Sequence, residues 1–135
     1  MKSASPRRLA NRWLGPVVGV YWLIAFSGTH LPGNALPTRP WGDKLDHMAG
    51  YLILGLLLCL WLGLSRPWIR YAPLWALALA IAYGALDEIT QPIVYRVADV
   101  GDWIADSIGA TVGVALGSTV VFLIRRRRNT QCDGG

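Results

Sequence analysis

The sequence predicts an all-α integral membrane protein, a bundle of four transmembrane helices with both termini in the cytoplasm. Hydrophobic residues make up 53% of the 135 residues and charged residues only 16%, whereas soluble domains average about 25% charged. The apolar residues also gather into four runs, separated by polar stretches rich in Pro, Gly and Asp. The apolar fraction excludes a disordered chain, and a content of only two cysteines excludes a disulfide scaffold.

The four runs cover residues 13–28, 47–64, 71–86 and 103–124. A helix needs about 20 mainly apolar residues to cross the hydrocarbon core, and each run approaches that length. None alternates strictly, as a membrane strand does, and four strands are too few for a barrel. Helices are therefore expected, because they satisfy the backbone hydrogen bonds inside lipid. Residues 65–67, Ser-Arg-Pro, break the second helix from the third.

The first run follows a basic arm, residues 1–12, and has two interpretations. A basic stretch, an apolar stretch and the small residues around Ser27 together are typical of a cleaved secretory signal. We expect a retained helix, since the run continues uncharged beyond Ser27 and its loss would leave three helices with few packing partners. A mature N-terminus at Gly28 would favour cleavage instead.

The distribution of Lys and Arg predicts the orientation. Ten of the thirteen lie in the arm, in the connection at residues 65–70 or after Ile124, and only Arg39, Lys44 and Arg96 fall on the other side. Basic residues favour the cytoplasmic side, so both termini are expected there, in the bacterial inner membrane. Residues 125–135 are expected to be a disordered, basic cytoplasmic tail that contacts anionic lipid. No nucleic-acid partner is expected.

Residues able to carry chemistry gather at the outer end of the second run. Asp43, His47 and Tyr51 are spaced by four, which places them on one stripe of a helix, and Lys44 lies beside Asp43. Ionisable residues at membrane depth are costly, so they tend to face the bundle interior and to mark sites. This stripe is therefore a candidate site.

The third and fourth runs add polar residues at the same outer end. Asp87 and Gln91 share a helix face with Glu88 adjacent, and Arg96 follows in the loop. Asp102 and Asp106 are spaced by four at the start of the fourth run, so they also share one face. The sequence therefore predicts one outward-facing cluster built from three helices.

Several of these residues also have a structural interpretation. Asp43 and Asp102 each follow a Gly at a helix start, where an Asp side chain caps free N–H groups. Lys44 and Arg96 have the alternative role of neutralising nearby carboxylates. Two further acidic residues are expected to be solvated: Asp46 and Asp99.

The starts of the second and fourth helices resemble each other in sequence. Residues 42–50 and 101–109 share Gly-Asp, an aliphatic residue two positions after the Asp, an ionisable residue four positions after it, and a closing Gly. Two hairpins related by an axis along the membrane normal would produce this pattern. We therefore expect the two helices to lie near each other, with His47 and Asp106 at equal depth.

A stripe of small residues continues below Asp106 on the fourth helix. Gly109, Gly113 and Gly117 are spaced by four, and small residues at this spacing let helix backbones approach closely. Packing within the chain is one interpretation, and the seam of a homo-oligomer is the other.

These motifs resemble the VanZ-like family of small bacterial membrane proteins. The resemblance rests on Asp43-Lys44-x-x-His47-x-x-x-Tyr51, Asp87-Glu88-x-x-Gln91, Arg96 and Asp102-x-x-x-Asp106-x-x-Gly109, in this order over about residues 43–113. Two positions depart from the pattern: Asp106 stands where the family commonly has Asn, and Tyr95 stands where Gly is frequent. The second departure affects the turn of the loop, because Tyr adopts a positive φ less easily than Gly. The resemblance implies a VanZ-like membrane domain over 13–124 and a role in resistance to teicoplanin, a glycopeptide antibiotic acting on cell-wall precursors.

Two classes of function follow from these residues. The first is an envelope enzyme or binding protein acting on a lipid-linked molecule among the membrane lipids, with His47 as general base or metal ligand and Asp87 and Glu88 as further catalytic candidates. The substrate-binding candidates are Asp43, Lys44, Tyr51, Gln91, Arg96, Asp102 and Asp106. A divalent metal is compatible with this acidic site, since a phosphate would need one. The second class is a non-catalytic transporter, assembly partner or structural protein that uses the same cluster for binding or helix packing.

Overall fold

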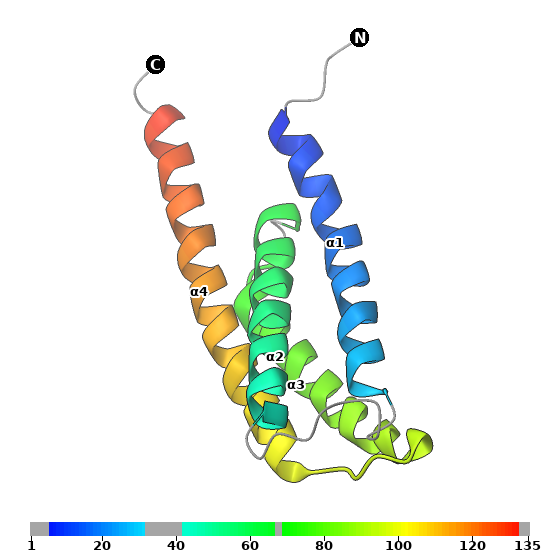
Figure 1. Cartoon of the computed structure of the whole chain (residues 1–135). Helices are drawn as coiled ribbons and strands as arrows, with labels where there is room; N and C mark the ends of the chain where they lie inside the picture. The colour runs from blue at the N-terminus through cyan, green and yellow to red at the C-terminus, as the bar shows by residue number, and fades with distance from the viewer. Residues whose placement is uncertain (1–5, 32–41, 67–68, 133–135) are drawn as a thin grey trace.

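The chain folds into a bundle of long helices, seen in a computed structural model that describes residues 6–31, 42–66 and 69–132. The long helices are α1 (Pro6–Thr29), α2 (Gly42–Leu60), α3 (Ala72–Thr90) and α4 (Val100–Cys132). A π-helical turn, η2 (Trp61–Ser65), continues α2, and a 3-10 turn, η3 (Gln91–Val94), continues α3. Both ends of the chain lie at one end of the bundle, the terminal end (Figure 1).

Three helical segments are long and apolar enough to cross a membrane: Gly42–Ser65, Ala72–Val94 and Val100–Arg127. The prediction of a fourth span over residues 13–28 is therefore not met. Helix α1 is 24 residues long and runs along the bundle beside the others (Figure 1). Its composition is the reason, because every stretch of 18 residues within this helix includes Arg12, and glycines and Pro16 further dilute its aliphatic side chains.

The observed helices are longer than the apolar runs at several ends. Helix α4 continues to Cys132, so residues 125–132, expected to be disordered, are helical. Arginine is a good helix former, and extending an existing helix avoids the cost of nucleation. The expected break at residues 65–67 agrees with the end of η2 at Ser65.

Helices α2 and α4 run side by side in the same direction (Figure 1), and the glycine stripe of α4 allows their close approach. A Cβ atom added at Gly109 would collide with the carbonyl oxygen of Met48, and one at Gly113 with that of Leu52. At Gly117 it would lie 2.8 Å from the Cβ of Cys59. The stripe therefore serves packing within the chain, and its glycines are buried against α2.

The expected correspondence between the second and fourth helices is confirmed. Nδ1 of His47 lies 3.0 Å from Oδ1 of Asp106, and Sγ of Cys59 lies 3.5 Å from Oγ of Ser118. Both contacts join residues 59 positions apart, the offset between the two similar segments. Equivalent residues therefore face each other at equal depth.

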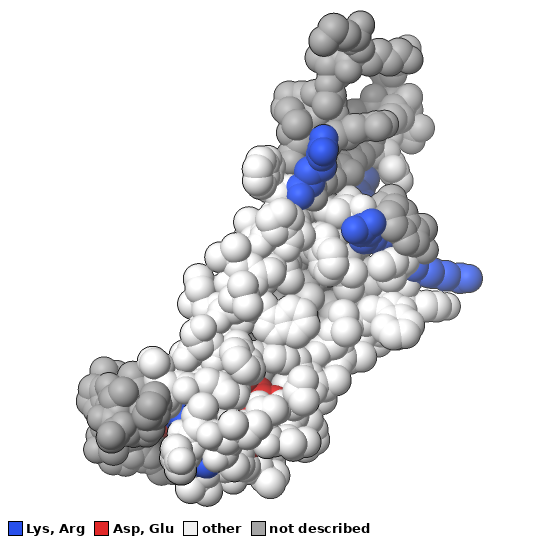
Figure 2. All heavy atoms as spheres, turned by 90° about the vertical axis from the view of Figure 1, so that its right-hand side faces the viewer, with Lys and Arg blue, Asp and Glu red and all other residues white. Residues whose placement is uncertain are grey.

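The two ends of the bundle differ in charge. The outward faces of the helices carry large exposed hydrophobic side chains, among them Leu74, Ile89 and Phe122, which suits a surface in contact with lipid. Figure 2 shows Lys and Arg side chains over the terminal end, whereas carboxylates are visible only near the opposite end. We call this opposite end, which includes the start of α2, the end of α3 and the start of α4, the polar end.

Candidate functional site

The polar end holds a buried polar cluster. Six of its residues are polar or charged and at most 6% exposed: His47, Asp87, Glu88, Gln91, Asp102 and Asp106. They come from α2, α3, η3 and α4. Buried ionisable groups are costly unless partnered, so their contacts define what this site can do. The predicted meeting of the three helices is confirmed for these residues.

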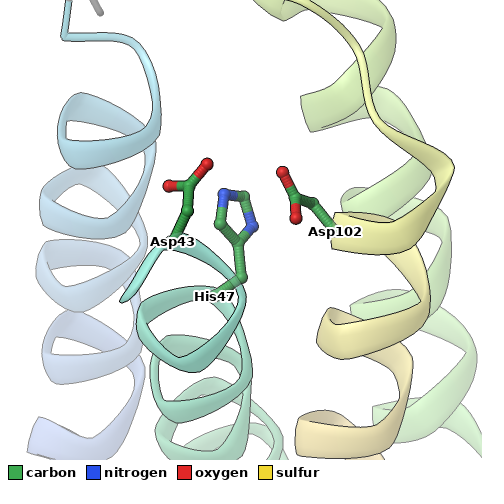
Figure 3. A group of neighbouring side chains, drawn as sticks. All are labelled: Asp43, His47 and Asp102. Atoms are coloured by element: carbon green, nitrogen blue, oxygen red, sulfur yellow. The ribbon is translucent and has the colours of Figure 1, made fainter. Parts of the chain in front are cut away.

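His47 and Asp106 form the most deeply buried pair. Nδ1 of His47 lies 3.0 Å from Oδ1 of Asp106, with 3% and 0% of the two side chains exposed. We assign the proton to Nδ1, because a carboxylate accepts hydrogen bonds and orients the imidazole that donates to it. The second nitrogen, Nε2, is then an unprotonated acceptor. The ring lies between the carboxylates of Asp43 and Asp102 (Figure 3).

Glu88 joins the end of α3 to the loop before α4. Its Oε1 accepts a hydrogen bond from the side-chain amide of Gln91 at 2.9 Å, and its Oε2 accepts one from the backbone N–H of Asp99 at 2.8 Å. Both carboxylate oxygens are therefore engaged. Glu88 is a positioning residue for the start of α4 in this arrangement.

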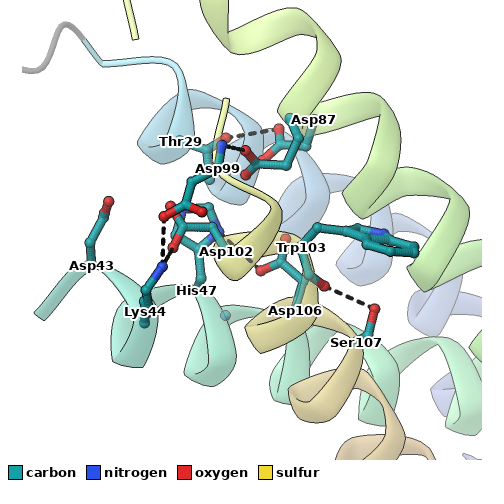
Figure 4. Close-up of polar contacts among 12 residues, drawn as sticks. Thr29, Asp43, Lys44, His47, Asp87, Asp99, Asp102, Trp103, Asp106 and Ser107 are labelled. Atoms are coloured by element: carbon teal, nitrogen blue, oxygen red, sulfur yellow. Dashed lines mark hydrogen bonds and ion pairs between the residues drawn. The ribbon is translucent and has the colours of Figure 1, made fainter. Parts of the chain in front are cut away.

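Lys44 bridges α2 and the start of α4 (Figure 4). Its ammonium donates to Oδ2 of Asp99 at 2.7 Å and to Oδ1 of Asp102 at 2.8 Å. Asp99 also accepts the N–H of Gly101 through Oδ1, so it caps α4. Asp99 is solvated as expected, with 52% of its side chain exposed, but it also has the structural contacts with Lys44 and Gly101 that the sequence did not predict.

The ammonium of Lys44 and the N–H of Gly101 hold the pKa of Asp99 below its usual value. We expect Lys44→Gln to raise this pKa toward the ordinary range, because the carboxylate loses its cation, whereas Lys44→Arg keeps it low. The stabilisation by ionised Asp99 is present above the usual aspartate pKa and is lost as pH falls through the folded-state pKa. A carbon-13 NMR titration of the Asp99 carboxyl tests this, and an unchanged midpoint in Lys44→Gln would contradict the assignment.

Arg96 ties the polar end of α1 to that of α2. Its Nη1 donates to the carbonyl oxygen of Thr29 at 3.0 Å, and its Nη2 lies 3.2 and 3.3 Å from the two oxygens of Asp43. The preceding residue, Tyr95, takes a left-handed conformation with φ 60°, the conformation that glycine adopts most easily. Tyr95 is 96% exposed, so its side chain finds room there.

Sequence reasoning missed two residues of this cluster, Thr29 and His30. The hydroxyl of Thr29 donates to Oδ1 of Asp87 at 2.9 Å, and Nε2 of His30 lies 3.0 Å from Oγ1 of Thr90. The signal was present, since His30 is an ionisable residue at the end of an apolar run, as His47 is at the start of one. Through these contacts α1 is attached to α3.

Four buried polar atoms in and around the cluster have no hydrogen-bond partner among the described residues. They are the hydroxyls of Tyr51 and Tyr83 and the Oδ2 atoms of Asp87 and Asp106. The two tyrosine rings stack with their centroids 5.9 Å apart. Buried polar atoms in native proteins are nearly always satisfied. The cluster therefore has unused capacity to bind a proton, a water molecule or another ligand.

A cavity of about 300 Å³ opens beside the cluster, between α1, α2 and Arg96. One part of its wall is apolar, with Ile24, Ala25 and Leu31. The other part is polar, with Asp43, His47 and Arg96. A wall divided in this way suits a ligand with a polar head and an apolar neighbour.

Two groups of side chains have the spacing of metal ligands, and they share His47. In one group the ligand atoms of Asp43, His47 and Asp102 lie within 4.8 Å of one another, and in the other those of His47, Glu88 and Asp106 do so. Imidazole and carboxylate ligands suit divalent transition metals.

The comparisons with known proteins give one match. The model of the VanZ/LLP1 family matches residues 3–123, which include all the helices of the bundle except the last turns of α4. No curated protein and no solved structure matches the chain.

Proposed function

Because the chain belongs to the VanZ/LLP1 family and has a mixed polar and apolar cavity, we propose a function at the bacterial envelope. The polar end binds the headgroup of a lipid-linked, cell-wall-related molecule. The observation that carries the proposal is the cavity between α1 and α2, which places the buried cluster beside an apolar wall. Its volume of about 300 Å³ is at the lower end for ligand sites, so it fits part of a headgroup rather than a whole precursor.

The chemistry of the cavity wall favours hydroxyl- and amide-rich headgroups. The carboxylate of Asp43 accepts hydrogen bonds, Nε2 of His47 accepts one, and the hydroxyl of Tyr51 both donates and accepts. Lys44 and Arg96 do not supply free positive charge, because each is paired with a carboxylate. Sugars and peptides of cell-wall precursors present the complementary groups.

The distribution of charge supports an outward orientation of the polar end. The described basic residues of the terminal end include Arg66, Arg70 and Arg125, and basic residues favour the cytoplasmic side. We therefore place the terminal end in the cytoplasm of the bacterial inner membrane. The cluster then faces the side on which cell-wall precursors and teicoplanin meet.

A structural role is the second candidate, favoured by the hydrogen bonds of the cluster itself. Thr29 binds Asp87, Lys44 binds Asp99 and Asp102, and Gln91 binds Glu88. These contacts join all four long helices or the loops beside them. If they serve packing alone, loss of phenotype in any variant tracks loss of folded protein.

Filling the cavity without touching a charged residue separates the two candidates. Ala25 lines the cavity, and we expect Ala25→Phe to weaken binding of a short-chain, lipid-linked disaccharide-pentapeptide at least tenfold. Ala78→Phe is the matched control, since Ala78 is exposed on α3 and is not part of the cavity wall. Binding is measured by native mass spectrometry of the detergent-solubilised chain, and teicoplanin susceptibility is measured in cells that express each variant.

The two candidates give opposite results in this experiment. Under the proposal, Ala25→Phe remains folded by circular dichroism but loses binding and any protection against teicoplanin, while Ala78→Phe retains both. Equal binding by the two variants, or no binding by the unaltered chain, would overturn the headgroup proposal and favour the structural role.

A further inference from the structure

The polar end carries far more negative than positive charge. Between Asp43 and Asp106 the sequence holds seven carboxylates, and four of them are buried: Asp87, Glu88, Asp102 and Asp106. Of the two cations at this end, Lys44 contacts one buried carboxylate, that of Asp102, and Arg96 contacts the exposed Asp43. Uncompensated buried charge is expensive, so such a group is either neutralised by protons or paired with a cation. Two hydrogen-bonded cations do not balance this cluster.

His47 presents an unengaged ring nitrogen toward two of these carboxylates. Its side chain is 3% exposed, and Nδ1 is committed to Asp106. Nε2 makes no hydrogen bond to any part of the chain that the structure describes. Figure 3 shows a ring nitrogen of His47 pointing toward the space between Asp43 and Asp102.

This arrangement is that of a histidine prepared to bind a metal ion. A ligating imidazole typically donates its other N–H to a carboxylate, which fixes the tautomer and raises the basicity of the ligating nitrogen. Asp106 fills that role for His47. The ligand atoms of Asp43, His47 and Asp102 lie within 4.8 Å of one another. An ion with bonds of about 2.0–2.2 Å holds its ligand atoms roughly 3–4 Å apart. Small shifts of the three side chains would therefore bring their ligand atoms to the spacing that such an ion needs.

The outer group is a better candidate than the inner one because of its access, although its carboxylates also have partners. Arg96 contacts both oxygens of Asp43, and Lys44 contacts Oδ1 of Asp102, so a bound ion would have to replace these contacts. In the inner group, both oxygens of Glu88 are engaged by Gln91 and by the backbone of Asp99, and Nδ1 of His47 faces Asp106 rather than an open position. The outer group borders the cavity through Asp43 and His47. An ion there has a path of entry and an open coordination position.

We propose that Asp43, His47 and Asp102 bind one divalent first-row transition metal ion at the polar wall of the cavity. One imidazole and two carboxylates suit Mn²⁺, Fe²⁺ or Zn²⁺ better than Mg²⁺ or Ca²⁺, which prefer oxygen ligands alone. This inference deepens the proposed function and rests on it for its biological meaning. In that function, the ion supplies the positive charge that a phosphate of the lipid-linked molecule needs.

Metal binding is tested on the chain alone, without lipid probe. The detergent-solubilised chain is stripped with a chelator and dialysed against Mn²⁺, which avoids the preference of Zn²⁺ for thiolates. We expect one Mn²⁺ per chain by elemental analysis, with a nitrogen coupling from imidazole in pulsed electron paramagnetic resonance. Mg²⁺ at equal concentration should not displace it.

Asp43→Asn and Asp46→Asn make a matched pair, because both remove one exposed carboxylate from α2 beside the cavity. Asp43→Asn should weaken Mn²⁺ binding at least tenfold and Asp46→Asn less than twofold. Absence of stoichiometric binding would overturn the proposal. So would equal losses in both variants, or binding that depends on Glu88 and not on Asp43.

Failure of the metal site and failure of the headgroup site are distinguishable. Ala25→Phe blocks the apolar wall and should leave Mn²⁺ binding within twofold of the unaltered chain. If the chain binds no metal but Ala25→Phe still reduces probe binding, the headgroup proposal stands and the metal proposal falls. If Mn²⁺ binds as expected but the probe does not, the metal proposal stands alone.

Discussion

Replacing His47 with leucine is expected to lower the free energy of unfolding by about 3–5 kcal/mol. The side chain of Asp106 is fully buried, and its one hydrogen bond in the described structure is to Nδ1 of His47. Without the imidazole, Asp106 loses that partner, and its Oδ2 already has none. Removing one member of a buried pair costs more than the pair itself contributes, because the remaining group is left unsatisfied.

A second substitution should recover part of this loss. In His47→Leu with Asp106→Asn, the residual group at position 106 is a neutral amide, whose burial costs less than that of a carboxylate. Unfolding by a denaturing detergent, followed by circular dichroism, measures both variants. A loss below about 1 kcal/mol in His47→Leu, or a double variant less stable than the single one, would contradict the contribution assigned to this pair.

The meeting of the polar residues could be predicted from the sequence because two simple rules determine it. Helical spacing places Asp43, His47 and Tyr51 on one stripe, and alternating spans bring the ends of α2, α3 and α4 to the same side. The similarity between residues 42–50 and 101–109 also gave the depth of His47 relative to Asp106. The resulting contact at 3.0 Å fits that reasoning.

The partners of the individual charges could not be predicted in the same way. The sequence leaves two interpretations of Lys44 and Arg96, binding of a substrate and neutralisation of nearby carboxylates. The ion pairs of Lys44 with Asp99 and Asp102 and of Arg96 with Asp43 agree with the second, but the particular partners do not follow from the sequence. The sequence shows how many charges share an end, whereas their pairing depends on side-chain positions. For the same reason the cap at Asp99 was missed, because capping was assigned to the residues that follow a glycine.

Two errors concern the ends of the chain, where local composition misleads. Residues 125–132 have no apolar periodicity, but they are helical because α4 already exists and continuing it is inexpensive. Helix α1 was counted as a span, although its apolarity falls short of that of the other three. Its attachment to α3 through Thr29 and His30 depends on contacts between residues about 60 positions apart in the sequence. Local sequence patterns do not predict such contacts.

The glycine stripe leads to the second large expected effect. Replacing Gly113 with alanine should impose a steric cost of about 1–3 kcal/mol on the bundle, the usual cost of overpacking. The added Cβ would collide with the carbonyl oxygen of Leu52 and lie 2.8 Å from the backbone nitrogen of Leu56. These are backbone atoms of α2, which cannot rotate away as a side chain can. Helices α2 and α4 would have to move apart along their whole contact.

Gly19→Ala is the matched control, because a Cβ at Gly19 meets nothing within 4 Å. Both glycines lie inside helices, so both substitutions gain the same helix propensity of about 1 kcal/mol. The difference in unfolding free energy between the two variants therefore isolates the steric cost, and we expect Gly113→Ala to be the less stable by about 1–3 kcal/mol. Equal stabilities would mean that α2 and α4 lie farther apart than this structure has them, and the contact of His47 with Asp106 would then be in doubt as well.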